Sequence, residues 1–302
     1  MQSMKKIILS CSVLLLSAIT AIPGSVPAPQ PQATPATEEN SHDLFDWNAT
    51  YTFDSDFDQQ KLGHGSSLHS DFSYDHRFLV TGHWYLRMGL EYERFDFGGT
   101  DNGLPDHLQA LYAHLAYEYI FKDHAGAGIE LDPGVYFQSH VTLDAVDVPW
   151  KIFVTFPLKK DKIFGVIGLG GGLYQDPPVA PGGGIIWLFN DKLRLEGVFP
   201  KPALVYSPTD DLEFRILGQI LYDDFRTDDV VTPEKRLQLH NAVLQYDEVR
   251  AGVQARYDGF HPFRFIAGAG YTVNRTFDFF RADQRVHGHG APYVEFAIQA
   301  RF

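Results

Sequence analysis

The sequence predicts an all-β protein, an antiparallel transmembrane β-barrel of about 12–14 strands with short periplasmic turns and longer extracellular loops. Three observations lead to this fold class. The C-terminal segment alternates strictly between apolar and polar residues, turn signals recur at short intervals and differ in kind, and the front end is typical of exported proteins. The alternative is a soluble β-sandwich, since its strands also alternate between apolar and polar residues.

The last segment of the chain alternates up to its final residue. One set is aliphatic and aromatic and the other is mostly polar: Val294, Phe296, Ile298, Ala300 and Phe302 against Glu295, Ala297, Gln299 and Arg301. Successive side chains of a strand point to opposite faces, so the segment fits a wall between lipid and water. The terminal Phe resembles the insertion signal of bacterial outer-membrane barrels, although Ala300 stands where that signal often has an aromatic residue. The resemblance assigns this role to Phe296, Ile298 and Phe302 and implies the barrel-assembly machinery as a partner during insertion.

Residues 1–21 form a predicted signal peptide. Lys5 and Lys6 precede an apolar core over 7–22, which is short for a membrane-spanning helix, and cleavage is expected near Ala21. Cys11 is the only cysteine, and a lipid anchor on it is a less favoured alternative because the apolar run before it is short. The mature chain then has no cysteine for a disulfide or for thiol chemistry.

Residues 22–44 are rich in Pro, Ala, Gln and Thr and are predicted to be a disordered tail. Without the signal peptide the chain has 23 basic and 38 acidic residues, a net charge of −15. This charge argues against nucleic acid as a partner, because phosphate binding needs a basic face. No apolar run after residue 22 is long enough for a membrane-spanning helix, so any membrane crossing would be made by strands.

Residues 45–302 are predicted to form the barrel, because two kinds of turn signal alternate along them. Short polar turns are expected at 122–124, 159–162, 190–192, 209–211 and 258–261, and mostly longer loops at 97–107, 139–146, 174–181, 224–241 and 276–290. A transmembrane barrel sorts its connections in this way, whereas a sandwich has no reason to. The segments between turns number about 14, or 12 if 192–199 and 201–207 form one strand. Five glycines in 163–174 predict bends or a tightly curved wall.

Apolar and polar residues alternate most clearly in six segments: 84–93, 111–121, 148–158, 212–223, 248–257 and 263–274. Their apolar sets carry aromatic residues toward the ends, as an interfacial girdle would. The charged residues of the polar faces are the candidates for lining the lumen: Arg87, Glu91, Glu118, Lys151, Arg194, Glu213, Arg215, Glu248, Arg250, Arg256, Arg264, Glu295 and Arg301.

Charge is expected to be nearly balanced inside the barrel and negative at its mouths. With Glu93, Glu196 and Lys192 added, the polar faces carry seven anions and nine cations, which predicts an ion-pair network rather than a filter of one sign. The Asp residues concentrate in loops and strand ends. An acidic rim would favour cations by its local field, but hydration of the mouth is the simpler interpretation.

Histidine and serine motifs give little sign of chemistry. His287 and His289 with Asp283 could form at most a weak metal site, and the serines near His64 and His69 lie in a polar stretch where such neighbours arise by chance. We therefore predict no catalytic residues, no metal and no cofactor.

Two stretches resemble an uncharacterised family of outer-membrane β-barrels that is catalogued only as a domain of unknown function. They are Phe199 to Leu212, with a Pro-rich hairpin before an Asp turn, and Ala267 to Arg275, followed by Phe277, Phe279 and Phe280. The resemblance covers about residues 45–302 and implies a fold and a location but no activity. It marks Pro202 and Arg275 as structural features.

These observations predict a non-enzymatic barrel in the bacterial outer membrane, in contact with outer-membrane lipid, that acts in porin-like passage of small solutes. The alternative is a non-conducting structural or adhesion barrel with acidic surface loops. A lipid-modifying enzyme embedded in the membrane is a third, less favoured possibility.

Overall fold

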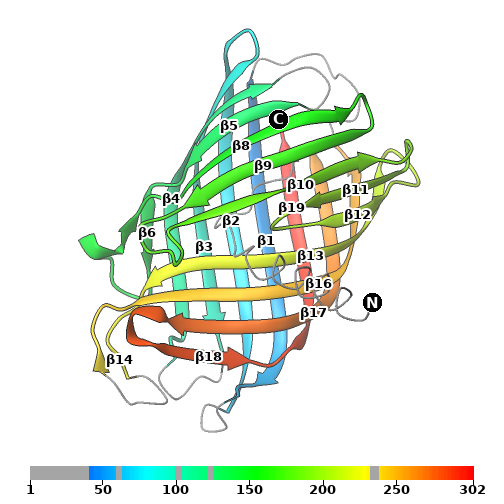
Figure 1. Ribbon diagram of the computed structural model, residues 1–302. Coiled ribbons are helices and arrows are strands. Elements are labelled where there is room, and N and C mark those ends of the chain that lie inside the picture. Colours follow the sequence, from blue (N-terminus) through cyan, green and yellow to red (C-terminus); the bar gives the residue numbers. More distant parts are fainter. Residues whose placement is uncertain (1–40, 59–62, 99–103, 121–124, 232–237) are drawn as a thin grey trace, which may run out of the picture.

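The computed structural model describes residues 41–58, 63–98, 104–120, 125–231 and 238–302, which form a closed antiparallel β-barrel (Figure 1). The strands of the wall are β1 (Ser41–Asp56), β2 (His64–Thr81), β3 (Trp84–Phe97), β4 (His107–Ile120), β5 (Gly126–Leu131), β6 (Gly134–Phe137), β7 (Val146–Asp147), β8 (Trp150–Lys159), β9 (Ile163–Gly171), β10 (Val179–Leu188), β11 (Leu193–Val198), β12 (Ala203–Tyr206), β13 (Leu212–Arg226), β16 (Val243–Phe260), β17 (Phe263–Phe279), β18 (Gln284–Gly288) and β19 (Ala291–Arg301). The pairs β5–β6, β7–β8 and β18–β19 are interrupted single crossings, so the barrel has 14 strands.

The strand count confirms the larger of the two predicted numbers. Segments 192–199 and 201–207, the least certain pair, are the separate strands β11 and β12, which pair antiparallel with each other. The barrel closes where β1 pairs with β19, as in the partners Trp47 and Ile298. Closure leaves no open strand edge, which is the condition for a sheet to cross a membrane. In the described residues no helix is long and apolar enough to span a membrane.

The two ends of the barrel differ, as predicted. One end, here called the turn end, carries both the start of β1 and the C-terminus, where Asp43 and Phe302 exchange two backbone hydrogen bonds of 3.0 Å. It has short connections such as 160–162 and 189–192. The opposite loop end has the longer ones, including 227–242, which contains the small hairpin of β14 (Val230–Val231) and β15 (Gln238–Leu239).

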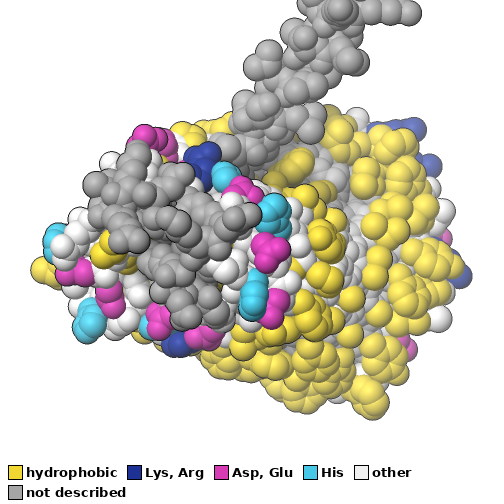
Figure 2. Space-filling model, turned by 90° about the horizontal axis from the view of Figure 1, so that it is seen from below, with side chains coloured by type: hydrophobic (Ala, Val, Ile, Leu, Met, Phe, Trp, Pro, Cys, Tyr) yellow, Lys and Arg dark blue, Asp and Glu magenta, His cyan; other side chains and the backbone are white. Residues whose placement is uncertain are grey.

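The outer wall is apolar. Ile216 of β13 and Leu90 of β3 are 63% and 61% exposed, whereas the neighbouring Arg215 and Glu91 turn inward. Aromatic pairs lie toward both ends, as in Trp84 stacked on Tyr117 near the turn end and Tyr51 against Phe53 near the loop end. Figure 2, a view onto the loop end, shows the hydrophobic outer wall beside a rim of acidic and histidine side chains. This arrangement is typical of a transmembrane barrel, in which an apolar outer band faces lipid and the polar rim at the loop end faces water.

The wall changes its course near the loop end. β13 pairs with β12 only from Phe214 to Leu217 and then continues to Arg226, which pairs in parallel with Phe137 of β6. The backbone N–H of Gln138 donates to the carbonyl oxygen of Arg226 at 2.8 Å. β6 and β13 are far apart in the strand order, so this seam of β6 and β13 narrows the interior at the loop end (Figure 1).

Some boundaries differ from the sequence analysis. Residues 41–44, assigned to the tail, belong to β1 because they pair with β2 and β19. Segment 276–290 is no long loop: most of it continues β17 or pairs back as β18, joined by the 3-10 turn Phe280–Ala282. A turn at 258–261 is shorter than expected, since β16 runs to Phe260. The signal peptide, most of the tail and the turn at 122–124 lie outside the described residues.

Candidate functional site in the barrel interior

All thirteen charged residues predicted to line the lumen lie on the inward register of their strands. They alternate with exposed apolar residues, as Arg215 does with Phe214 and Ile216. Because a strand has a side-chain period of two, one outward residue determines the direction of its neighbours. Arg301 is the exposed member, at the turn end. Most of the others are joined in three groups.

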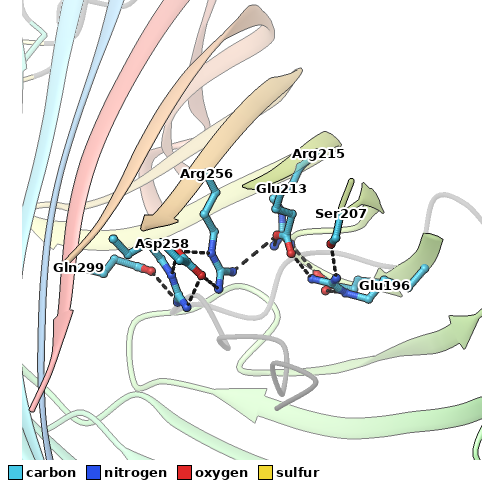
Figure 3. Close-up of polar contacts among 9 residues, drawn as sticks. Glu196, Ser207, Glu213, Arg215, Arg256, Asp258 and Gln299 are labelled. Atoms are coloured by element: carbon cyan, nitrogen blue, oxygen red, sulfur yellow. Dashed lines mark hydrogen bonds and ion pairs between the residues drawn. The ribbon is translucent and has the colours of Figure 1, made fainter. Parts of the chain in front are cut away.

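The first group is a line of ion pairs along the wall from β11 to β17, here called the ionic ladder (Figure 3). Arg194 contacts Glu196 at 2.8 Å and Glu213 at 2.6 Å, and Arg215 contacts Glu213 at 3.0 Å. The ladder continues through Arg256, which lies 3.6 Å from Glu213 and 3.2 Å from Asp258. Arg264 then joins Asp258 at 2.6 Å and Gln299 of β19 at 3.3 Å.

The second group surrounds Glu130, the inward carboxylate of β5. Arg87 donates to Glu130 at 2.9 Å and lies 3.2 Å from Glu118, while the Lys151 ammonium pairs directly with Glu130. His114 lies between carboxylates, with Nδ1 3.0 Å from Asp75 and Nε2 3.0 Å from Glu130. Both ring nitrogens thus face carboxylate oxygens of other strands.

The only described group of three close metal-type ligands lies here: His114, Glu130 and Asp132 have ligand atoms within 4.8 Å of one another. Lys151 and Arg87 already neutralise Glu130. Glu130 is therefore the centre of a compact salt-bridge cluster whose cations are supplied by the protein itself.

The third group belongs to β16 and its neighbours. Glu248 accepts hydrogen bonds from Arg250 at 2.8 and 3.1 Å, from Tyr246 at 2.7 Å and from Thr272 at 2.8 Å. Gln254 donates to Glu295 at 2.6 Å. These contacts agree with the predicted ion-pair network, in which opposite charges are matched on the inner wall.

Arg275, which the family resemblance marked, is a buried tie between strands. Only 1% of it is exposed, and its guanidinium donates to the carbonyl oxygen of Gly65 at 2.9 Å and to the hydroxyl groups of Ser55 and Ser67. It thereby connects β17 to β1 and β2 near the loop end. Pro202, the other marked residue, accepts the backbone N–H of Gly218 through its carbonyl oxygen, where β13 leaves β12.

A layer of aromatic side chains crosses the interior near the loop end. We define this aromatic layer as Phe95, Phe97, Phe225, Tyr246 and Phe277, each at most 6% exposed. The rings of Phe95 and Tyr246 lie 5.0 Å apart and those of Phe97 and Phe277 4.9 Å apart. β3 is not a sheet neighbour of β16 or β17, so these contacts span the lumen.

Sequence reasoning did not find the aromatic layer, although a signal exists. Along the inward register of β3 the residues change from Glu91 and Glu93 to Phe95 and Phe97. The same change from charged to aromatic runs from Arg275 to Phe277 on β17. Aromatic residues at strand ends were assigned to the outer girdle, whereas these belong to the inner face.

Acidic residues also lie where the sequence analysis did not expect them. Asp75, Asp132, Asp147 and Asp224 are buried, with at most 7% exposed, whereas the sequence analysis placed Asp residues mainly in loops and strand ends. Tyr222, expected on the lipid face, is buried as well and donates to the carbonyl oxygen of Asp176 at 2.9 Å. Tyr222 lies beyond the part of β13 that pairs with β12, and there it contacts the segment after β9.

Histidines of the loop end have separate partners and do not form one cluster. His289 lies 3.1 Å from Asp58, whereas His287 contacts Thr276 at 3.1 Å, so the two rings have different partners. His140 reaches Asp228 of another loop at 3.2 Å. Partial burial raises the pKa of Asp228, but hydrogen bonds from Ser139 and His140 outweigh burial and hold that pKa below its ordinary value. His69, near several serines in sequence, instead contacts Glu93 at 2.7 Å and stacks on Phe95.

Comparison with known proteins finds similarity to this chain among solved structures. No family model matches it, and no curated protein matches it. Among solved structures it is similar to the toluene transporter TodX of Pseudomonas putida, with 11% identity over 94% of this chain and 95% of that one and a TM-score of 0.41. The translocator domain of the autotransporter NalP from Neisseria meningitidis gives 8% identity over 98% of both chains and a TM-score of 0.42. LpxR from Salmonella typhimurium gives 9% identity over 85% of this chain and 99% of that one, with a TM-score of 0.39. Similarities this weak do not assign an activity, which has to be argued from the residues of this chain.

Proposed function

We propose that this protein is an outer-membrane barrel for the passage of small solutes, and that the aromatic layer is the barrier such a solute has to displace. The observation that carries the proposal is the contrast between the two halves of the interior. Side chains of the ionic ladder keep part of their surface exposed, such as 22% for Arg264 and 30% for Asp258. The rings of the aromatic layer are sealed from solvent.

Lining a lumen with charged side chains has a cost in free energy. Buried ion pairs rarely stabilise a protein more than well-packed apolar residues would, because desolvation opposes their attraction. A wall whose only task was to be stable would gain little from the ionic ladder. A wall that meets water and polar solutes needs such a lining, and its matched charges avoid a strong field of one sign.

Location and partners belong to the same proposal. The apolar outer face, the aromatic pairs near both ends and the terminal Phe support insertion into the outer membrane, with its lipid and the barrel-assembly machinery as partners. We also propose that the protein is not an enzyme. His69 and His114, the buried histidines of the described residues, contact carboxylates of other strands, so both rings belong to the polar network of the inner wall.

The test is conductance in a planar lipid bilayer. We expect the refolded protein to conduct weakly, and Phe95→Ala to conduct several-fold more, because it removes the ring that contacts both Phe225 and Tyr246. The matched control is Phe214→Ala, which removes a 46% exposed ring from the outer face of β13. Absence of current from the wild type and from Phe95→Ala would instead support a non-conducting structural or adhesion barrel.

A further inference from the structure

A small cavity of about 20 Å³ lies beside the seam of β6 and β13, with room for one or two water-sized groups. Its lining residues are Glu93, Tyr112, Asp132, Tyr136, Asp147, Pro149, Gln175, Asp223 and Asp224. Five of these nine are carboxylic acids and none is basic. The acids come from β3, from the interruption between β5 and β6, from β7 and from β13, so the cavity joins parts of the wall that are distant in sequence.

Three oxygen atoms in this lining are buried without a hydrogen-bond partner. They are Oδ1 of Asp132, Oδ1 of Asp224 and Oε1 of Gln175, in side chains of residues that are 4%, 6% and 6% exposed. Oδ1 of Asp132 lies 3.8 Å from Nε2 of His114, which is beyond hydrogen-bond distance. A buried acceptor that is left unpaired costs about 1–3 kcal/mol, and a charged one costs more. A hydrogen-bond donor or a cation beside these oxygen atoms would remove this cost.

The protein's own cations near the cavity have their shorter contacts elsewhere. Lys151 pairs directly with Glu130 and forms only a longer ion pair of 3.8 Å with Oδ2 of Asp132. Arg226 donates to the carbonyl oxygen of Asn241 and stacks over Tyr174. Two of the five acids are held in place by other groups: Asp147 accepts the backbone N–H groups of Val148 and Leu173, and Glu93 contacts His69.

We propose that this cavity binds one hard divalent cation of the Ca²⁺ class. The donors are Asp132, Asp224 and Gln175, with Asp223 supplying further negative charge. Carboxylate and amide oxygens are the ligands that Ca²⁺ prefers, whereas softer metals are selected by Cys and His. No three carboxylates of this cavity have oxygen atoms within 4.8 Å of one another, so at most two of them bind the ion directly and the ion keeps part of its water shell.

At this location the ion connects segments that come from different parts of the wall. Asp224 lies on the part of β13 that has left β12, while Asp132 lies between β5 and β6 and Gln175 follows β9. A cation shared by these residues ties β13 to the opposite wall, beside the single parallel pair of Arg226 and Phe137. It therefore stabilises the closure of the loop end.

Isothermal titration of the refolded barrel with CaCl₂ tests the site directly and needs no conducting lumen. We expect one Ca²⁺ per chain, and a loss of affinity of at least about tenfold in Asp223→Asn/Asp224→Asn, because two carboxylates are lost. The matched control is Asp210→Asn/Asp211→Asn, a second Asp pair at the other, exposed end of β13, which should bind as the wild type does. Equal affinity in the two variants would overturn the assignment, as would a wild type that does not bind millimolar Ca²⁺.

A second measurement keeps the proposal testable if the double variant does not fold. Gln175→Leu removes the amide oxygen at similar size, and Ca²⁺ should raise its unfolding temperature less than that of the wild type, each compared with EDTA. An unfolding temperature of the wild type that is the same in Ca²⁺ and EDTA would contradict the proposal. These measurements do not depend on current. A negative result would therefore contradict the cation site without contradicting the proposed passage of solutes, and a barrel without conductance could still bind the ion.

Discussion

Arg250 and Glu248 lie two residues apart on the inner face of β16 and form a two-pronged ion pair of 2.8 and 3.1 Å in which neither residue is more than 2% exposed. The same spacing recurs along the barrel, in Arg194 with Glu196 and in Arg256 with Asp258. A strand places residues i and i+2 on one face, so oppositely charged residues at this spacing can pair without help from the rest of the fold.

Removal of one partner of the Arg250 and Glu248 pair should destabilise the barrel strongly. Arg250→Met leaves the buried Glu248 carboxylate with only Tyr246 and Thr272 as donors, which should lower the free energy of unfolding by about 3–5 kcal/mol. The double variant Glu248→Leu/Arg250→Met removes both charges and should lose clearly less. Urea unfolding in lipid vesicles measures the difference, and a double variant as unstable as Arg250→Met would show that packing, and not charge, holds this site.

The ionic ladder should set the selectivity of any current. Arg256→Gln removes the cation between Glu213 and Asp258, so the passage should become more permeable to cations, by about twofold in the cation-to-anion ratio for the loss of one of several charges. Reversal potentials in a salt gradient give this ratio. Arg94→Gln is the matched control, because Arg94 pairs with Asp96 at 2.6 Å on the outer register of β3. An equal shift of the permeability ratio in both variants would show that the selectivity follows the overall charge of the protein and not the ionic ladder.

The terminal aromatic residue should matter for assembly more than for stability. Phe302 is 59% exposed and contacts the ring of Phe263 edge to face at 6.3 Å, so Phe302→Ala should slow insertion in cells while refolding in detergent stays near that of the wild type. Heat-modifiable migration of membrane fractions over time measures assembly. Phe263→Ala loses the same ring contact without changing the terminus. If it slows insertion equally, the contact and not the signal is responsible.

A close approach of two strands should make one glycine irreplaceable. A Cβ atom at Gly184 of β10 would overlap the carbonyl oxygen of Gly197 on β11, so Gly184→Ala should destabilise the barrel by about 1–3 kcal/mol. At Gly218 of β13 the nearest atom to such a Cβ is 3.7 Å away, and Gly218→Ala should be nearly neutral. Urea midpoints of the two variants compare them, and similar losses would rule out the steric explanation.

Local sequence patterns predicted the wall well because a strand's side-chain direction depends only on its own backbone. The alternation in β3, β13 and β16 identified which face each side chain takes up to Leu217, and the kinds of turn identified the two ends of the barrel. The prediction failed at 276–290, where polar residues suggested a loop. Their hydrogen bonds to β17 depend on a partner strand that a local pattern does not show.

The chain's sequence by itself determined which residues face lipid and which charged residues face the interior, since period-two alternation is a local property. Which side chains meet in the interior of the barrel was decided by the tertiary structure. The contact of Phe95 with Tyr246 and the seam from Phe137 to Arg226 join residues distant in sequence and on strands that are not neighbours in the sheet. Such contacts exist only once the sheet has closed, because closure brings opposite walls to within the reach of a side chain.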